Sequence, residues 1–534
     1  MNSSFEDALL NFQNRRFLDA ERQCAAALEA EPGNANAHHL MGAILSAEQR
    51  LDSALGHFEE TVRLAPSMTE ARFNLGKTYR DLQRHADAYK IFKSVANEWP
   101  TRSDVWLELA VALERTEQTI EAIAAYERAI EIGASSSLVW FQLGCCYMAC
   151  NTFEKAENAF DQSLILDPAH APTWINLAVT RENRKELASS IEIYAALLNK
   201  APQYHEAAYR HALGLLQTGN LEMGWRAYAS RGLWPQTKTN HGSTDAPFWR
   251  GEDLTGKSLL VWTEQGPGDE ILMGTMIEDL LCHGAHITLA CSARVAPLFK
   301  RSFPTCQVVI RGDTQLPEQA TRGFDFQASL TEVGLNSRQN LDSFSTSAPY
   351  LVTDTKRTQD LRSKYADGQR IRPIIGISWR SSNDAAGNQK STKLLDWADI
   401  LKSVDANFVC LQYGDADEEL FTLKAQLGLE IFKDHDIDPL SDMDAFTSQV
   451  AAMDLVISTS NTTVHVAGAI GLDVWTLVPE GTGQPWYWFL DRSDCLWYPS
   501  MKLFRQPNAG NWLAPLTAVR QELEDWIVNW PRLK

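Results

Sequence analysis

Residues Asp454 to Pro479 have the sequence DLVISTSNTTVHVAGAIGLDVWTLVP, which places a short polar turn between two apolar runs. Leu455 to Ser458 have the pattern of a buried strand, and the polar turn follows directly. Small residues then favour a helix that packs closely on a sheet, and they include Ala467, Gly468 and Ala469. The order of strand, turn, helix and strand predicts a βαβ unit in a parallel sheet.

The polar turn of this unit consists of Ser460, Asn461, Thr462 and Thr463. Hydroxyl-bearing residues at a helix N-terminus leave backbone N–H groups and the positive end of the helix dipole facing a ligand. The expected ligand is an anion, and a diphosphate fits best.

Two further stretches of the same kind lie upstream. IIGISWR begins at Ile374 and ends at Arg380, and SLLVW spans Ser258 to Trp262. Short apolar runs alternate with amphipathic helical stretches over residues 247–506, which predicts an α/β fold with parallel sheets.

The SLLVW strand runs into TEQGPGDEI, Thr263 to Ile271. Gly266 and Gly268 allow a tight turn with close approach of a ligand, and Asp269 begins the following helix. The third glycine of a dinucleotide fingerprint is missing, and no Gly-Lys-Ser/Thr of a phosphate-binding P-loop follows. The loop therefore predicts a ligand site of another kind.

The N-terminal part has a different pattern, a period of 34 residues that ends near residue 235, before a polar linker at 236–245. Four registers share this period. They comprise prolines (Pro32, Pro66, Pro100, Pro168, Pro202), small residues (Gly42, Gly76, Ala110, Gly144, Ala178, Ala212), alanines (Ala20, Ala54, Ala88, Ala122, Ala156) and aromatic residues (Phe58, Phe92, Tyr126, Phe160, Tyr194, Tyr228). Small residues let two helices approach, and proline ends the second helix.

This pattern resembles the tetratricopeptide repeat family, with six full repeats at 1–204 and a divergent cap at 205–235. The resemblance implies an all-α solenoid whose concave groove binds a protein. Asn74 and Asn176 share one repeat position, which is similar to the asparagine ladder of repeat-bearing O-GlcNAc transferases. Glu108 and Gln142 interrupt that ladder, and a solvated asparagine is the alternative interpretation.

The second half resembles the heptosyltransferase-like (family 9) glycosyltransferases, and in particular repeat-fused bacterial members, which include those that modify flagellin. The motifs are GDEI after the first strand, K-x-x-x-W from Lys393 to Trp397, LQYG at 411–414 and STSNTTVHVAGAIG at 458–471. The resemblance implies a GT-B fold of two Rossmann-like lobes, 247–355 on the acceptor side and 370–506 on the nucleotide-sugar side. A C-terminal helix is expected at 510–534.

The family also implies a metal-independent, inverting transfer with no cofactor, in which the nucleotide-sugar is a substrate. Asp269 matches the general base, with a helix-capping role as the alternative, and Glu264 is a fallback base. The residues matching the donor site are Lys393 at the phosphates, Gln412 at the nucleotide base, the turn Ser460, Asn461, Thr462 and Thr463, and His465. Asp-x-Asp strings at 415–417, 434–438 and 442–444 are interpreted as chance products of an acidic chain, and Trp486, Trp488 and Trp497 as core.

The chain carries 49 Lys and Arg against 68 Asp and Glu, a net charge of −19. This balance argues against nucleic acid and against an anionic membrane surface as partners. The N-terminus lacks the features of a signal peptide, and no apolar run is long enough to span a membrane, so we expect a cytoplasmic protein.

Three functions follow from these observations. The first is transfer of a sugar from a nucleotide-sugar to a Ser or Thr hydroxyl of a protein held by the repeats, with flagellin suggested by family analogy. The second is transfer to a lipid-linked or polysaccharide acceptor, for which Arg294, Lys300 and Arg301 offer a weak basic patch. The third is a non-catalytic repeat scaffold that carries a degenerate transferase domain.

Overall fold

The computed structural model describes residues 3–234, 244–264, 266–312, 316, 322–344, 347–366, 371–381 and 387–530. The predicted linker, 236–245, lies outside the described residues except for Thr244 and Asp245. By the density of its internal contacts the chain divides into two compact units, Met1–Arg184 and Lys185–Lys534.

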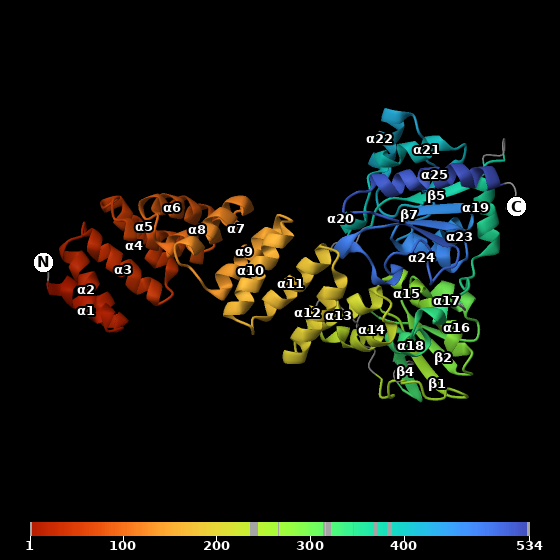
Figure 1. Ribbon diagram of the computed structural model, residues 1–534, viewed down its shortest axis with the longest axis horizontal. Coiled ribbons are helices and arrows are strands. Elements are labelled where there is room, and N and C mark those ends of the chain that lie inside the picture. The colour runs from red at the N-terminus through yellow and green to blue at the C-terminus, as the bar shows by residue number, and fades with distance from the viewer. Residues whose placement is uncertain are drawn as a thin grey trace. The chain divides into compact units, whose positions relative to one another are not determined.

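The first unit is a helical solenoid in which successive helices pack as antiparallel pairs (Figure 1). Its helices are α1 (Ser3–Gln13), α2 (Phe17–Ala30), α3 (Ala35–Ala47), α4 (Leu51–Leu64), α5 (Thr69–Asp81), α6 (His85–Glu98), α7 (Ser103–Arg115), α8 (Thr119–Glu131), α9 (Ser137–Ala149), α10 (Phe153–Leu166) and α11 (Ala171–Asn183). The predicted all-α solenoid is confirmed.

The 34-residue registers meet inside each pair of helices. A Cβ atom built on Gly76 would lie 2.7 Å from the ring of Phe92, and one on Gly144 would lie 2.5 Å from the ring of Phe160. The small residue and the aromatic residue sixteen positions later are therefore complementary, because only a missing side chain leaves room for the ring.

The turns inside the pairs also repeat with this period. One residue in each turn has a positive φ although it carries a side chain, and these residues are Arg15 (57°), Gln49 (61°), Gln83 (60°), Glu117 (61°), Asn151 (56°) and Lys185 (64°). The corresponding residue of the next turn is Gly219, with φ of 81°. The left-handed conformation disfavours residues with a Cβ atom, so each of the first six turns carries backbone strain.

The second unit begins with helices that continue the repeat pattern. They are α12 (Leu187–Lys200), α13 (His205–Gln217), α14 (Leu221–Tyr228) and the short 3-10 helix η1 (Ala229–Leu233). Trp225 of α14 is fully buried, donates a hydrogen bond to the Arg338 carbonyl oxygen (2.9 Å) and contacts the ring of Trp486 at 5.2 Å. This anchoring explains why the compact units divide at residue 184, whereas the sequence pattern placed the end of the array near 235.

The first α/β lobe has a parallel sheet in the order β3-β2-β1-β4. Its elements are β1 (Ser258–Trp262), α15 (Pro267–Gly274), α16 (Ile277–Leu281), β2 (His286–Cys291), α17 (Ala296–Ser302), β3 (Gln307–Ile310), β4 (Phe326–Ser329), α18 (Leu330–Ser337) and η4 (Leu341–Phe344). β1 is central and its described strand is buried, which agrees with its unbroken apolar sequence.

The second lobe has a parallel sheet in the order β6-β5-β7-β8-β9. Its elements are α19 (Thr355–Tyr365), β5 (Ile374–Ser378), α20 (Gly387–Lys390), η5 (Leu394–Trp397), α21 (Ala398–Ser403), β6 (Asn407–Cys410), α22 (Asp417–Leu427), α23 (Met443–Ala451), β7 (Leu455–Thr459), α24 (Thr462–Ala469), β8 (Val474–Val478), η6 (Gly481–Gly483), η7 (Trp486–Trp488), β9 (Met501–Arg505) and α25 (Leu513–Asn529). Figure 1 shows α21 and α25 on one face of this sheet, and α23 and α24 on the other.

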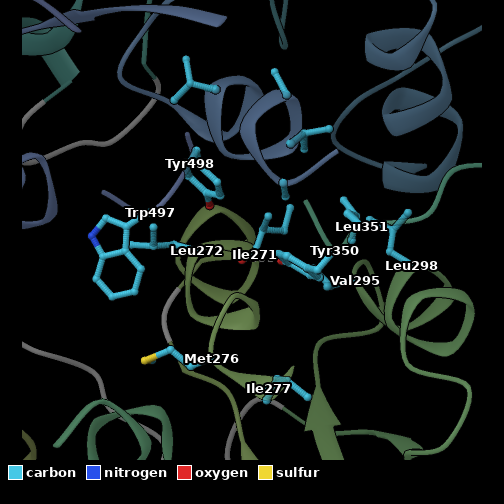
Figure 2. Packing of buried hydrophobic residues seen from close by; sticks show 14 of the residues in the cluster. Ile271, Leu272, Met276, Ile277, Val295, Leu298, Tyr350, Leu351, Trp497 and Tyr498 are labelled. Atoms are coloured by element: carbon cyan, nitrogen blue, oxygen red, sulfur yellow. Dashed lines mark hydrogen bonds between the residues drawn. The ribbon is translucent and has the colours of Figure 1, made fainter. Parts of the chain in front are cut away.

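One hydrophobic core runs through both lobes and through α13 and α14. Figure 2 shows Ile271 of α15 beside Tyr350, which belongs to the segment that joins the lobes. Tyr350 donates its hydroxyl hydrogen to the Ile271 carbonyl oxygen, and the backbone N–H groups of Tyr350 and Leu351 both donate to Ala469. The joining segment therefore ties α15 to α24. The architecture is a helical solenoid followed by two parallel α/β lobes, as predicted for a GT-B fold.

Candidate active site

The loops that carry the predicted motifs lie at corresponding places of the two sheets. In the sheet order β6-β5-β7, the chain runs from β5 to its neighbour β6 on one side, and later forms β7 on the other side of β5. The loops that follow β5 and β7 therefore lead away from each other. The order β2-β1-β4 has the same property at β1 and β4. Open α/β sheets bind ligands at such switch points, beyond the carboxyl ends of the strands. The loop before α15 follows β1, and the turn before α24 follows β7.

Asp269 lies in the first turn of α15 and its side chain is half-buried. Burial raises the pKa of the Asp269 carboxyl to about 6, although the positive charge of Lys390 and a hydrogen bond from the Gly266 backbone act in the opposite direction. A carboxyl group with this pKa is mostly ionised at neutral pH and holds a proton more readily than an ordinary aspartate.

Lys390 is the cation that sequence reasoning missed. It ends the short helix α20 in the loop after β5 and is half-buried. Burial lowers the pKa of its ammonium group, and the Asp269 charge acts against that shift. Its position in the loop after a central strand could have indicated a role for Lys390 in ligand binding. The K-x-x-x-W spacing to Trp397 instead indicated Lys393.

Lys393 is exposed and lies three residues beyond Lys390, directly before η5 as its N-cap residue. The charge of Lys390 acts on both Asp269 and His465, which places Lys390 in the electrostatic environment of the candidate site.

Asn461 organises the start of α24. Its Oδ1 atom accepts hydrogen bonds from the Thr463 N–H (3.0 Å) and the Ser458 hydroxyl (3.2 Å), so it caps the helix. Its Nδ2 atom donates to the Ser378 hydroxyl (2.8 Å) and to the Arg380 carbonyl oxygen (3.2 Å). Asn461 therefore joins the loops after β5 and β7 across the switch point.

The neighbours of Asn461 differ in their exposure. Ser460 is buried and accepts a hydrogen bond from the Trp488 indole N–H at 2.8 Å. The Thr463 hydroxyl is buried and has no hydrogen-bond partner among the described residues. Thr462, the first residue of α24, is half-buried, so it is the member of the turn with the most accessible side chain.

His465 is buried in an aromatic cage. Its ring stacks on Trp488 with a centroid distance of 5.3 Å, and the edges of Tyr487 and Tyr498 enclose it. Burial and then the Lys390 charge lower the pKa of His465 to about 3, so its imidazole is neutral at physiological pH. Trp486, Trp488 and Trp497 are all buried, which agrees with their interpretation as core residues.

Helices α15 and α24 pack against each other and bring the two motif loops together. A Cβ atom built on Gly268 would lie 3.2 Å from His465 Cδ2 and 3.3 Å from Thr462 Oγ1. Gly268 is therefore the point of close approach between the lobes, and Asp269 comes immediately after it.

Two predicted site residues, Glu264 and Gln412, form contacts with other parts of the protein. Glu264 forms a buried ion pair with Arg231, a residue of η1. Gln412 accepts hydrogen bonds from Ser378 and from the backbone N–H groups of Trp379 and Arg380, and its amide donates to the carbonyl oxygens of Arg380 and Tyr413. The Gln412 amide thus has both donors and its acceptor occupied within the protein.

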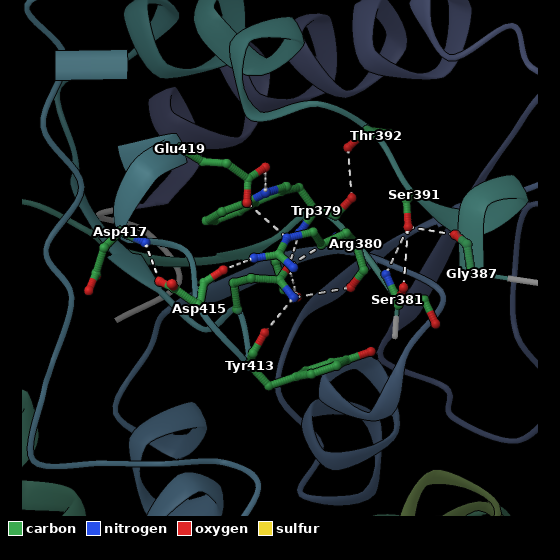
Figure 3. Close-up of polar contacts among 12 residues, drawn as sticks. Trp379, Arg380, Ser381, Gly387, Ser391, Thr392, Tyr413, Asp415, Asp417 and Glu419 are labelled. Atoms are coloured by element: carbon green, nitrogen blue, oxygen red, sulfur yellow. Dashed lines mark hydrogen bonds and ion pairs between the residues drawn. The ribbon is translucent and has the colours of Figure 1, made fainter. Parts of the chain in front are cut away.

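Figure 3 shows the wider network around the loop after β5. Arg380 donates to Glu419 Oε2 at 2.8 Å and also to the Asp415 carbonyl oxygen, and the Trp379 indole donates to Glu419 Oε1 at 2.8 Å. Ser391 accepts a hydrogen bond from the Ser381 N–H at 3.0 Å. These contacts fix both ends of the loop that carries Lys390.

The acidic strings have partners within the chain. Asp434 binds the Lys364 ammonium (2.9 Å) and the Tyr365 hydroxyl (2.7 Å), Asp442 caps α23, and Asp444 pairs with Arg301. Among the described residues, no group of three or more His, Cys, Asp or Glu side chains is arranged to hold a metal ion.

Asn74 and Asn176 lie on α5 and α11 of the solenoid and are half-buried. The Asn74 amide nitrogen lies 2.9 Å from His39 Nε2, and the Asn176 amide donates to the Cys145 sulfur at 3.3 Å. Each amide contacts the first helix of the repeat that precedes its own, α3 for Asn74 and α9 for Asn176. Their role in binding a peptide stays a prediction.

Comparison with known proteins bears on both halves. Three overlapping segments, 5–69, 39–103 and 73–137, match the tetratricopeptide repeat family, and residues 138–170 match it again. Residues 5–170 are tetratricopeptide repeats. Protein FlbA of Caulobacter vibrioides is 27% identical over 543 residues, which cover 98% of this chain and 89% of FlbA. The similarity to FlbA therefore includes the α/β lobes as well as the repeats.

Other relatives share less of the chain. Protein O-mannosyl-transferase TMTC3 of Mus musculus is 25% identical over 213 residues, 37% of this chain, and the match spans only 23% of the TMTC3 length. Among solved structures, the repeat protein YrrB is 22% identical, with a TM-score of 0.33 over 34% of this chain and 95% of YrrB. Within the described residues, none of the helices combines the length and apolar character needed to cross a membrane.

Proposed function

We propose that this chain is a glycosyltransferase that moves a sugar from a nucleotide-sugar to a hydroxyl group of a protein, which the tetratricopeptide repeats recruit. The observation that carries the proposal is the convergence of Asp269, Lys390 and the start of α24 at the facing switch points of two parallel sheets. Such a set of groups can bind an anion at the cation and the helix N-terminus, and can activate a hydroxyl nucleophile at the carboxylate.

Asp269 would act as the general base. Its carboxylate takes the proton of the acceptor hydroxyl as that oxygen attacks the anomeric carbon, and the nucleotide leaves from the opposite face with the bonding electrons. A pKa of about 6 supports this role, because a base works best when its pKa lies near the working pH. Glu264 is a weaker candidate because its carboxylate is buried in the ion pair with Arg231.

Lys390 and the first backbone N–H groups of α24 would stabilise the departing phosphate. The ammonium group supplies a full positive charge, and the helix N-terminus adds the positive end of its dipole. Thr462 would approach the phosphate with its accessible hydroxyl, whereas Ser460, Asn461 and Gln412 hold the loops in place. We assign the phosphate contact to Lys390 in preference to Lys393 because Lys390 lies near Asp269.

A protein acceptor is supported by the repeats, since solenoids of this family present extended surfaces that bind other proteins. TMTC3, which shares part of the chain, is named as a protein O-mannosyl-transferase, and this supports the same general reaction. Flagellin is the first acceptor to test, on the family resemblance. A lipid-linked acceptor has less support, because Arg294 donates to the Pro439 carbonyl oxygen and Arg301 pairs with Asp444 instead of forming an open basic patch.

The test has two steps. A thermal-shift screen of UDP, GDP, ADP and CMP compounds identifies the nucleotide, because a ligand that binds the folded state raises the melting temperature. The matching nucleotide-sugar is then incubated with flagellin and the protein, and the acceptor is weighed by mass spectrometry. We expect added mass equal to whole sugar units. No mass change with any donor, together with donor hydrolysis equal to that of Asp269→Asn, would favour the scaffold function.

A further inference from the structure

Arg231 fills the switch point of the first sheet. η1 places its guanidinium group against Glu264, in the loop after β1. Glu332, in the first turn of α18 after β4, adds a second negative charge near Arg231. Open sheets bind ligands at this place, between the two strands where the chain changes direction. Here a side chain from the last repeat-derived element occupies it.

The contact is buried and well held. Only 4% of the Arg231 side chain and 6% of the Glu264 side chain are exposed. Arg231 also donates to the Tyr228 carbonyl oxygen at 3.2 Å, and its guanidinium carbon lies 4.7 Å from the centre of the Tyr228 ring. Tyr228 in turn stacks on Tyr209 of α13 at 5.9 Å. The cation is therefore fixed from the side of the repeat-derived helices.

Glu264, the acidic partner in the ion pair, lies close in sequence to Asp269, the proposed base. Glu264 comes two residues before Gly266, which caps α15, and five residues before Asp269. The second carboxylate oxygen of Glu264 is buried and has no hydrogen-bond partner among the described residues. Arg231 is thus the main described polar partner of this carboxylate, and through it the position of the loop depends on η1.

We infer that the Arg231–Glu264 ion pair is a positioning device, through which the repeat-derived helices hold the loop between β1 and α15 and thereby fix Asp269. The consequence for catalysis rests on the proposed role of Asp269 as the base. Arg231 and Glu264 are paired with each other in a buried contact and would act through Asp269, so both are positioning residues. The repeats then do more than recruit an acceptor, because their last element completes the catalytic loop.

The experiment must separate positioning from stability. Loss of one partner leaves the other charge buried and unpaired, which destabilises the fold, whereas replacing both partners with apolar residues of similar size is often neutral. The main variant is therefore R231M/E264M in the full chain, with R231K as a conservative second variant. The matched control is R338M/D279M, which removes another ion pair of the same lobe, between α16 and the end of α18.

Two measurements are made on each variant. Hydrogen–deuterium exchange of the peptide covering 258–274 reports on the loop without any need for activity. Steady-state transfer reports kcat and the KM for the donor. For R231M/E264M we expect a melting temperature within a few degrees of wild type, exchange at least tenfold faster in that peptide, and kcat at least tenfold lower with donor KM within threefold. R231K should recover part of kcat, and the control should change neither exchange nor kcat.

The outcomes are distinct from those of the proposed function. Unchanged exchange and unchanged kcat in R231M/E264M overturn the inference, and so does a control pair that affects both equally. Faster exchange of the loop in a chain whose wild type transfers no sugar supports the anchoring by Arg231 and rejects the transferase. If R231M/E264M does not fold, R231K decides by the same two measurements.

Discussion

Gly268 and His465 approach each other so closely that a single methyl group on Gly268 would lie 3.2 Å from the His465 Cδ2 atom. Gly268 belongs to the first lobe and His465 to the second, and both are fixed, one by the start of α15 and the other by its aromatic cage. Neither the backbone at Gly268 nor the His465 ring can therefore move freely to make room for a side chain. The lobe contact beside Asp269 therefore depends on the absence of a side chain.

Gly268→Ala should weaken the enzyme more than Gly266→Ala. The added Cβ at 268 would press on His465 and Thr462 and move Asp269. Among the described residues, a Cβ at 266 would meet only the Asp269 carboxylate, at an ordinary distance of 3.8 Å. We expect a loss of about tenfold or more in kcat/KM for Gly268→Ala, because small misplacements of a reacting group are costly. Steady-state transfer measures both, and equal losses would contradict the close-contact argument.

Asp269→Asn should abolish transfer while nucleotide binding remains. Removal of a general base lowers the rate by about 10²- to 10⁴-fold, and the asparagine keeps the size of the side chain. The measurement is acceptor mass over time, with the thermal shift by nucleotide as the control for an intact donor site. Transfer within a factor of three of wild type would exclude Asp269 as the base.

The same variant should be more stable than wild type at pH 8 and no more stable at pH 4. Burial raises the pKa of Asp269 to about 6, so the folded chain binds this proton more tightly than the unfolded chain. The stability that the group contributes is present below its unfolded pKa and is lost as pH rises through about 6. Melting temperatures of both proteins across this range test the prediction, and a parallel pH dependence would refute it.

Lys390→Met should shift the acid limb of the pH–rate profile upward. Wild-type kcat/KM should fall as pH drops through about 6, where Asp269 takes up its proton. Lys390 lowers that pKa, so its removal raises it, and the rate at all pH values should also fall as the phosphate loses its cation. Lys393→Met is the comparison variant. A larger loss with Lys393→Met would return the phosphate contact to that residue.

Asn176→Ala and Asn74→Ala should raise the KM for the protein acceptor and leave donor hydrolysis unchanged. Asparagine amides on the first helices of repeats can bind a peptide backbone, whereas the proposed donor site lies in the α/β lobes. The Asn176 side-chain amide has the Cys145 sulfur, a weak acceptor, as its described hydrogen-bond partner, so it is more easily redirected to a ligand than that of Asn74 beside His39. Acceptor KM values near wild type for both variants would rule out the ladder.

The repeats and the strands were predictable because their signals are local and periodic. β1 at Ser258–Trp262 coincides with the apolar run that predicted it, and β7 at Leu455–Thr459 begins where the predicted strand begins. The pairing of Gly76 with the Phe92 ring follows from two registers of one period. Such patterns report on neighbours along the chain or on identical units, so one sequence is sufficient to find them.

The site was less predictable because its contacts join distant segments. Sequence spacing selected Lys393, but the path of the chain after β5 brings Lys390 toward Asp269 instead. Glu264 is chemically suited to be a base, and only the fold shows that Arg231, 33 residues earlier, neutralises it. Gln412 likewise is committed to the backbone around Arg380. The type of a residue limits the reactions that its side chain can perform, and its contacts in the fold determine which of these reactions is possible.

The left-handed residue in each turn of the solenoid has a practical consequence for protein engineering. The backbone strain occurs once in each repeat, so the total strain energy grows with the number of repeats. The packing of each added repeat must therefore offset the strain of its own turn. Glycine at Gln49, Gln83 or Glu117 would relieve about 1 kcal/mol or somewhat less per turn, after its own loss of chain entropy. These positions lie between helices, so a heat-resistant version of the array could be built without altering the helices that line the proposed protein-binding groove.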